Sequence, residues 1–319
     1  MRTTVTELAD RLRTEADAWA FLEELRWPNG PKCPTCHGRD VYLIIPKNGV
    51  SRRTTSGSQS QRRTWACRPC RRQFSATSGT MMHGTRIPIR VWVLVIFEMA
   101  ASKNGVAALE IERKYGLCAR SAWFLMHRIR ESMRWDWIDR WENAVVLADE
   151  AYIGGNPKWR HESKRTSTDG RGTDKVPVVS ILNESTGEVR SHVVTDVSGH
   201  TLGQILMGNV DPDGSTLVTD QWRGYLPVGQ FFSKHETVDH SEGEYVRAGY
   251  TTNPLESFFS QLKRSIDGTH HHVSSVHLHR YVAEHDWRRS NCRATDADRM
   301  AMLVESGEGR RLTYEQVKG

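Results

Sequence analysis

The chain has 319 residues, a net charge of +6 and a pI near 9.0, with 38% hydrophobic and 26% charged residues. A chain of this length buries enough apolar surface for more than one core, so we expect two or three domains. The longest strongly apolar run, residues 91–97, is well short of the roughly 20 residues needed to cross a bilayer. The N-terminal segment lacks the apolar stretch and cleavage site of a signal peptide, so we expect a cytoplasmic protein with no membrane partner.

The first segment, residues 5–24, repeats apolar side chains at helical spacing and predicts an amphipathic helix. Thr6 is a candidate N-cap, and Pro28 and Gly30 indicate that the helix ends before them.

Four of the six cysteines form two C-x-x-C pairs, Cys33 with Cys36 and Cys67 with Cys70. Two such pairs supply the four thiolates of a tetrahedral structural zinc site, and a small domain with little core depends on such an ion. The 30 residues between the pairs exceed the usual spacing, and we interpret the polar, Arg-rich stretch at 51–63 as an inserted loop. The alternative, a redox dithiol, is disfavoured because no thioredoxin-like βαβ pattern surrounds either pair. His37 is interpreted as a bystander, and Cys118 and Cys292 as ordinary small side chains.

Residues 41–74 contain no acid and eight basic residues. A solvated surface is the plain interpretation, but such a one-sided charge favours a polyanionic partner. We therefore predict DNA contacts from Arg62, Arg63, Arg71 and Arg72.

Residues 87–135 are helical by period, with Pro88 suited to a first turn and a break at residues 103–105. A segment at 106–115, a turn at Gly116 and a further helix resemble a helix-turn-helix, although many helical bundles contain such a turn. In the DNA-binding interpretation, the face of the last helix that carries Arg120 and Arg128 contacts the duplex.

From residue 144 onward, short apolar strands and helices are predicted in turn. Apolar strands are predicted at 144–148, 176–182, 189–197 and 215–219, with a hairpin at 183–187 and helices at 201–207 and 255–266. This order predicts a mixed α/β sheet with helices packed against it.

Three carboxylates stand out in this region. Asp149 and Asp220 each follow an apolar strand, and Glu256 lies in the first turn of the late helix. Each acid alone is explained as a turn or cap residue, but together they match the hard oxygen ligands of Mg²⁺ or Mn²⁺. Two such ions would support phosphoryl transfer.

Ordered motifs throughout the chain strengthen this interpretation. They are RWP at 26–28, WACRPCRRQF at 65–74, GT at 79–80 with His83, TRIP at 85–88, DEAYIGG at 149–155, TDQWRGY at 219–225, HSEGEYV at 240–246, NPLESFFSQLKR at 253–264, HLHRY at 277–281 and WR at 287–288. In these motifs the chain resembles the ISXO-like bacterial insertion-sequence transposases over roughly residues 15–295. The resemblance implies a zinc ribbon, a helical DNA-binding segment and an RNase H-like catalytic domain of the DDE type.

The resemblance places the first two catalytic acids on Asp149 and Asp220. Some members carry Asn at the third position, and here both Asn253 and Glu256 are available; we choose Glu256 because a carboxylate binds a divalent ion better. Asn253 then caps the helix or orients a ligand, and Lys263, on the same helix face as Glu256, corresponds to the basic residue with which DDE enzymes contact DNA. Arg264 is a further predicted DNA contact. Glu150 is left out because it should point to the opposite face of the sheet.

We therefore expect an N-terminal helix (1–30), a zinc ribbon (31–80), a helical DNA-binding segment (81–141), a catalytic domain (142–295) and a loosely ordered polar tail (296–319). The expected function is a transposase that binds the terminal inverted repeats of its element, cleaves the 3′ ends and joins them to target DNA, as a dimer or larger homo-oligomer by analogy. Alternatives are an inactive zinc-ribbon DNA-binding protein and an RNase H-type nuclease without strand transfer. The histidines at 270–272 are assigned a structural or phosphate-binding role rather than a second metal site.

Overall fold

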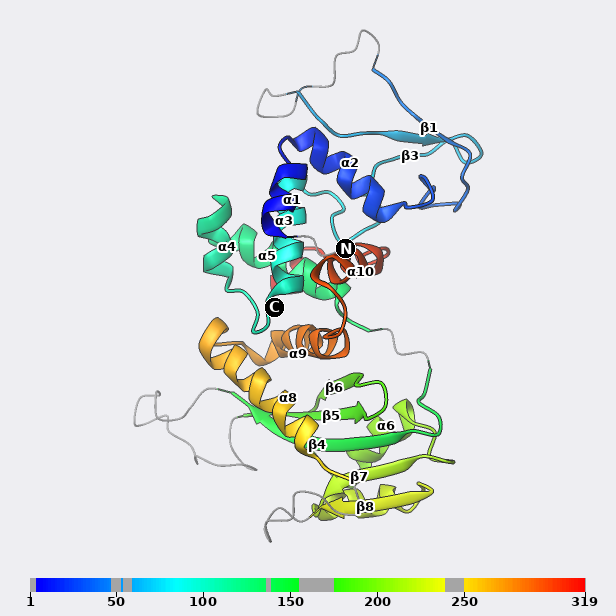
Figure 1. The fold of residues 1–319 in the computed structure, drawn as a ribbon, viewed down its shortest axis with the longest axis vertical. Coiled ribbons are helices and arrows are strands. Elements are labelled where there is room, and N and C mark those ends of the chain that lie inside the picture. Colours follow the sequence, from blue (N-terminus) through cyan, green and yellow to red (C-terminus); the bar gives the residue numbers. More distant parts are fainter. Residues whose placement is uncertain are drawn as a thin grey trace. The chain divides into compact units, whose positions relative to one another are not determined.

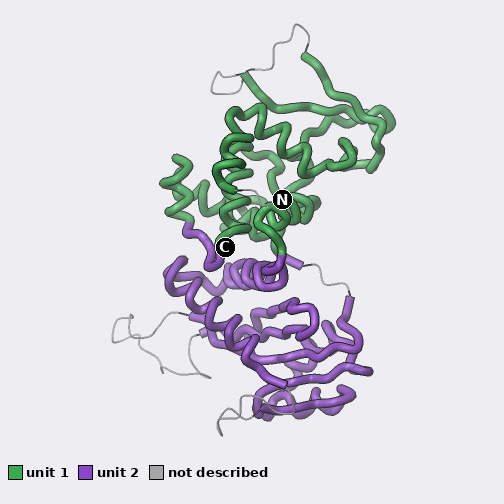
Figure 2. The backbone as a smooth tube through the Cα atoms, viewed as in Figure 1, with its two compact units in different colours: residues 1–102, 108–133, 294–319 green, residues 103–107, 134–293 purple. Residues whose placement is uncertain are grey.

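The computed structural model describes residues 4–46, 53, 59–135, 139–154, 175–238 and 250–318. The chain forms two compact units, coloured separately in Figure 2: residues 1–102, 108–133 and 294–319 make unit 1, and residues 103–107 and 134–293 make unit 2. The predictions for the inserted loop at 51–63, for the motif at 240–246 and for the end of the motif at 149–155 fall wholly or partly outside the described residues.

Unit 1 begins with two helices rather than one, α1 (Val5–Arg11) and α2 (Glu15–Arg26). The prediction of a single helix is wrong because Thr14 starts a new one: its hydroxyl accepts the Asp17 N–H and its N–H reaches the Asp17 carboxylate. Thr4 and Glu7 make the same reciprocal pair at α1, so Thr4 rather than Thr6 is the cap.

A small antiparallel sheet follows, with strands β1 (Val41–Leu43), β2 (Trp65–Cys67) and β3 (Gln73–Phe74) in that order. Trp27, at the end of α2, packs edge-on against Trp65 and Phe74, with ring centroids 6.3 and 5.8 Å apart. Strands this short bury little apolar surface, so the sheet depends on such ring contacts and on further links between its loops.

The rest of unit 1 is helical. Figure 1 labels α3 (Ile89–Ala101), α4 (Ala108–Tyr115), α5 (Ala119–Ser132) and α10 (Asp296–Ser306), and a short helix, α11 (Glu315–Lys318), follows them in the chain. The expectation of a loosely ordered tail is wrong for α10, which packs against α2, α3 and α5. Met300, Leu303 and Val304 recur at helical spacing and are buried there.

Unit 2 contains a five-stranded sheet of β4 (Val145–Ile153), β5 (Val176–Asn183), β6 (Val189–Val193), β7 (Thr216–Asp220) and β8 (Lys234–Val238). The strand order is β6-β5-β4-β7-β8, in which β4, β5 and β6 pair antiparallel while β4, β7 and β8 pair parallel. The predicted RNase H-like α/β class, a mixed sheet with flanking helices, is confirmed. The hairpin at 183–187 is also confirmed, and β8 is an additional edge strand.

Helices cover both faces of this sheet. On one face lie α6 (Gly199–Asn209), the short helix η4 (Arg223–Tyr225) and α7 (Leu226–Gly229); on the other lie α8 (Asn253–Arg264) and α9 (Ser275–Ser290). Alternate residues of β4 enter the two cores, Leu147 under α8 and Val146 under α6. A π-helical turn, Ser265–His270, continues α8. Within the described part of the chain, no helix combines the length and apolar character needed to span a membrane.

Candidate active site and metal centre

The first two candidate acids are brought together by the register of two parallel strands. Leu147 of β4 pairs with Val218 of β7, and Asp149 and Asp220 each lie two residues further along their strands. Leu147 and Val218 both point into the core beneath α8. Because side chains alternate between faces, Asp149 and Asp220 occupy neighbouring positions on that same face. β4 itself continues to Ile153 rather than ending at Asp149, because β5 pairs with it as far as Val176.

The third candidate acid comes from α8, which crosses this face. Glu256 lies in the first turn of α8 and lines a cavity of about 700 Å³ together with Asp149 and Lys263. Asn253 is the first residue of α8, not its cap: Thr252 is the N-cap, and Asn253 is exposed.

Electrostatics link the three acids. Burial raises the pKa of Asp149 to about 7, although the N–H of Glu150 donates to its Oδ1 at 2.8 Å and opposes the shift. The negative charges of Glu150, Asp220 and Glu256 contribute to this rise in the pKa of Asp149. Repulsion of this kind is relieved by a cation between the carboxylates, and hard oxygen donors are those that Mg²⁺ and Mn²⁺ prefer. The donor set therefore fits the expected ions.

The position of Asp220 is fixed by its own loop. The N–H of Trp222 donates to Asp220 Oδ1 at 2.9 Å, and the hydroxyl of Thr219 donates to the Asp220 carbonyl at 2.7 Å. Both partners belong to the TDQWRGY motif, so this motif turns the chain at the end of β7 and holds the carboxylate.

Sequence reasoning missed a pair of residues on the opposite face. Tyr225 is fully buried in the core beneath α6, and its hydroxyl donates to Glu150 Oε2 at 3.1 Å. Glu150 thus meets the other core, as its alternation with Asp149 predicts. Burial raises the pKa of Tyr225 well above its ordinary value, with the charge of Glu150 adding to the effect, so the phenol stays a donor. The available signal was the tyrosine that ends the TDQWRGY motif, five residues after Asp220.

Two basic residues end α8. Lys263 and Arg264 both line the cavity and are exposed, and Lys263 lies two helical turns beyond Glu256. This edge of the cavity therefore combines cationic side chains with the candidate acids, an arrangement suited to a phosphodiester.

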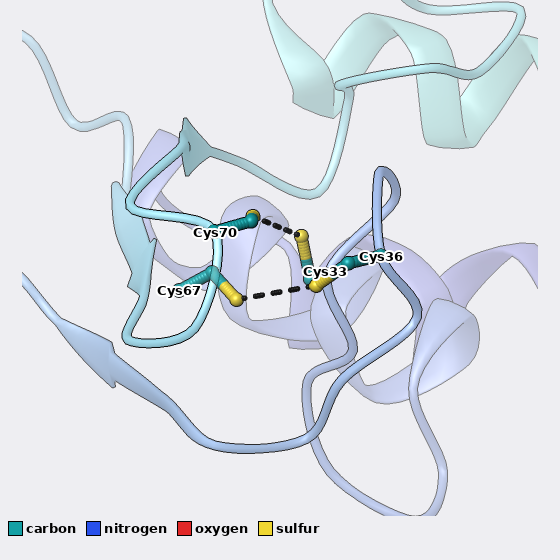
Figure 3. A group of neighbouring side chains, drawn as sticks. All are labelled: Cys33, Cys36, Cys67 and Cys70. Carbon is teal, nitrogen blue, oxygen red and sulfur yellow. Dashed lines mark hydrogen bonds between the residues drawn. The ribbon is translucent and has the colours of Figure 1, made fainter.

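The four paired cysteines converge in unit 1, as Figure 3 shows. Their sulfur atoms all lie within 4.8 Å of one another, with Cys33 Sγ to Cys70 Sγ at 3.6 Å and Cys36 Sγ to Cys67 Sγ at 3.5 Å. Tetrahedral zinc with Zn–S bonds of about 2.3 Å requires sulfurs about 3.8 Å apart. The cluster therefore has the donor set and spacing of a structural zinc site.

The backbone builds the two halves of this cluster alike. The residue after each second cysteine, His37 or Arg71, has a positive φ, 58° and 57° respectively. Each C-x-x-C turn is closed by the same backbone bond, from the Cys33 N–H to the Gly38 carbonyl and from the Cys67 N–H to the Arg72 carbonyl. His37 is exposed and outside the cluster.

Among the described residues, the cysteines are the group of three or more potential ligands that converges this tightly. The three candidate acids are spaced more widely than that. The histidines at 270–272 form no such group either; His270 packs edge-on against Tyr281, with ring centroids 4.8 Å apart.

The arginines predicted to bind DNA occupy different environments. Five of them are exposed: Arg62, Arg71, Arg72, Arg120 and Arg264. Arg63 instead forms an ion pair with Glu23 at 3.0 Å.

Arg128 departs from the expectation of an exposed DNA contact. It is buried, with its guanidinium over the rings of Trp92 and Phe124 at 5.0 and 5.5 Å. Its Nη2 donates to the His83 carbonyl at 2.7 Å. A guanidinium stacks favourably on aromatic faces, which accounts for these contacts. The helical period of the sequence does not include this effect, and it therefore predicts an exposed position for Arg128.

The burial of Arg128 restricts the helix-turn-helix interpretation to the first turn of α5. α4 and α5 pack together around Gly116, which has a φ of +63°. On α5, His127 and Arg130 are also buried, whereas Arg120 in the first turn is exposed. The first turn is the part of a recognition helix that reaches base edges.

Comparison with known proteins finds two matching domains in this chain. Residues 143–290 match the ISXO2-like transposase domain, and residues 13–73 match the transposase zinc-ribbon domain. The chain belongs to the ISXO2-like transposases. It is also 26% identical over 305 residues to an uncharacterized protein in transposable element ISH50 of Halobacterium salinarum, covering 92% of this chain and 97% of that protein. The matched domains of this ISXO2-like chain include both C-x-x-C pairs and all three candidate acids.

Proposed function

We propose that this ISXO2-like chain is an active DNA transposase, which binds the ends of its element, cleaves their 3′ ends and joins them to target DNA. The observation that carries the proposal is the β4–β7 register, which sets Asp149 beside Asp220 under the helix that carries Glu256. We propose residues 31–80 as the zinc ribbon, 81–141 as a DNA-binding segment and 142–295 as the catalytic domain, with the zinc held by the four cysteines.

The proposed roles follow from the geometry. Asp149, Asp220 and Glu256 would hold two divalent ions, and such ions would supply activation of a water or a 3′-hydroxyl and stabilisation of the leaving oxygen at phosphorus. Lys263 and Arg264 would bind the DNA phosphates next to the reacting one. Asn253, exposed at the start of α8, would orient a ligand, and a homo-oligomer would hold two ends together.

The experiment is a cleavage and joining assay with labelled duplexes from the element's termini, a plasmid target and Mg²⁺. Asp149→Asn, Asp220→Asn and Glu256→Gln should abolish both reactions while DNA binding and folding persist. Asp213→Asn and Glu184→Gln make the same chemical changes at exposed turn residues of unit 2 and should retain activity.

Different failures have different meanings. Joining that survives in Glu256→Gln but is lost in Asn253→Ala would move the third ligand to Asn253. Binding of the termini without cleavage by the wild type would favour the inactive DNA-binding protein, and cleavage without joining would favour the nuclease.

A further inference from the structure

The C-terminal segment of unit 1 is bonded to residues 79–81, which follow β3 in the chain. Met81 N–H donates to the Gly307 carbonyl at 2.9 Å, and Gly309 N–H donates to the Gly79 carbonyl at 2.7 Å. Thr80 and Glu308 form the bridge between these bonds. Residues 307–309 therefore lie alongside residues 79–81 in a fixed register, although some 230 residues separate them in the chain.

Gly79 connects the segment of Arg311 to His83: its carbonyl accepts from Gly309, two residues before Arg311, and its N–H donates to the His83 ring. Arg311 is exposed and lies between Gly309 and the buried side chain of Leu312. Further on, Tyr314 packs edge-on against Phe124 of α5, with ring centroids 5.5 Å apart. The contacts before and after Arg311 fix the position of its backbone, from which the guanidinium extends.

The charges of three arginines act on His83, and one of these arginines, Arg128, is bonded to the His83 carbonyl. The His83 Nδ1 accepts the N–H of Gly79 at 3.1 Å, so the neutral ring presents Nε2–H as a donor. Burial lowers the pKa of His83, and the charges of Arg311, Arg128 and Arg62 lower it further. Arg128 lies beneath, bonded to the His83 carbonyl, while Arg62 and Arg311 are exposed. The acid adjoining this segment, Glu308, forms an ion pair with Arg26 at 3.5 Å.

We propose that Arg62, His83 and Arg311 form a binding site for the DNA backbone, completed by the C-terminal segment. Two guanidinium groups and an N–H donor match the oxygens of a phosphodiester. Arg62 and Arg311 are exposed and His83 is half-buried, and Arg62 belongs to the acid-free sequence 41–74; exposed cations of this kind fit a polyanion better than an enclosed small anion. The inference rests on the proposed function, and it adds Arg311 and His83 to the DNA-binding residues.

The experiment measures binding of the full-length, zinc-loaded protein to a fluorescent duplex of arbitrary sequence as a function of salt. Losing one phosphate contact lowers the slope of log affinity against log salt by about 0.9. Arg311→Ala should therefore weaken binding at low salt, with the deficit shrinking about 3.5-fold between roughly 50 and 200 mM salt. His83→Ala should weaken binding in the same direction, and Arg311→Lys should keep the slope.

The matched control is Arg13→Ala, which removes the same charge from an exposed arginine of unit 1 that is paired with Asp10. It should leave the slope unchanged. A slope for Arg311→Ala equal to that of the wild type would overturn the proposed site. The site would also be overturned if inorganic phosphate, at constant ionic strength, abolished the difference in DNA affinity between the wild type and Arg311→Ala, because that result would identify a small-anion site. Failure of the wild type to bind any duplex would instead contradict the proposed function, whereas loss of joining without a change in slope concerns the acids alone.

Discussion

Asp286 of α9 carries a fully buried carboxyl group that is hydrogen-bonded to a residue of β6. Its oxygens accept from the N–H and the hydroxyl of Ser191 at 2.9 and 2.6 Å, and the Ser191 hydroxyl lies 2.7 Å from that of Ser180. Burial raises the pKa of Asp286 to about 8, and the two Ser191 bonds lower it only in part. The carboxyl group therefore joins helix to sheet mainly in its protonated form.

Folding should consequently weaken as pH rises from about 4 to about 8. In that window the folded state holds a proton that the unfolded state has lost, so the stabilisation is complete below the unfolded pKa of 3.8 and falls as pH rises toward 8. One such proton contributes at most about 1.4 kcal/mol per pH unit. Asp286→Asn keeps the hydrogen bonds and should flatten this dependence in calorimetric unfolding. An unchanged pH slope in the variant would show that Asp286 is ionised in the folded protein.

The Tyr225 hydroxyl anchors Glu150, the residue next to Asp149. Tyr225→Phe keeps the ring but removes the donor, which should cost about 1–3 kcal/mol in the free energy of unfolding because a hydrogen bond to a charged acceptor is lost. Joining activity should fall as well, since Glu150 N–H orients Asp149. Denaturant unfolding and the joining assay measure the two effects. Phe231→Leu changes an exposed aromatic residue of the same unit and serves as the control.

The zinc ribbon is the element that depends most on a bound ion. Its strands have two or three residues each, too few to fold on their own hydrophobic surface. Cys67→Ser, or chelation, should unfold β1–β3 and remove the Trp27–Trp65 contact while the sheet of unit 2 persists. Hydrogen exchange resolved along the chain measures this.

Cys118→Ser provides the control for the zinc prediction because Cys118 is exposed and outside the cluster. It should leave the exchange of β1–β3 unchanged. Protection of these strands that survived complete metal removal would contradict the prediction.

At the same scale, elements with strong local signals were predictable from the sequence. The apolar runs at 176–182 and 215–219 became β5 and β7, and the hairpin at 183–187 has Gly187 at a φ of +76° where a left-handed residue is needed. β8 was not predictable, because its sequence KHETV has one apolar residue buried and four polar ones; its pairing with β7 alone defines it.

The candidate site was predictable in its residues but not in its arrangement. The proximity of Asp149 and Asp220 depends on a parallel register between strands some 70 residues apart, which no local pattern encodes. Arg128 shows the opposite error. An arginine on a helix is expected at the surface, but the rings of Trp92 and Phe124, from α3 and its own helix, cover it.

At the scale of the whole molecule, unit 1 is assembled from three separate stretches of the chain, and its last stretch is residues 294–319. The N-terminal half is therefore incomplete without the C-terminus. α10 packs against α2 and α3, and the segment after it supplies the strand-like pairing with residues 79–81. Folding of unit 1, and any DNA binding by it, should both depend on residues that follow unit 2 in sequence.

Leu303→Ala tests this dependence with a single side chain. Leu303 is fully buried on α10, and truncating such a leucine leaves a cavity that costs about 2–5 kcal/mol. Unit 1 should lose that stability, measured by denaturant unfolding with exchange protection of α2 and α3 as the local readout. Met302→Ala, one residue earlier and 40% exposed, should cost far less. Equal losses in the two variants, or a loss confined to unit 2, would mean that α10 does not complete the core of unit 1.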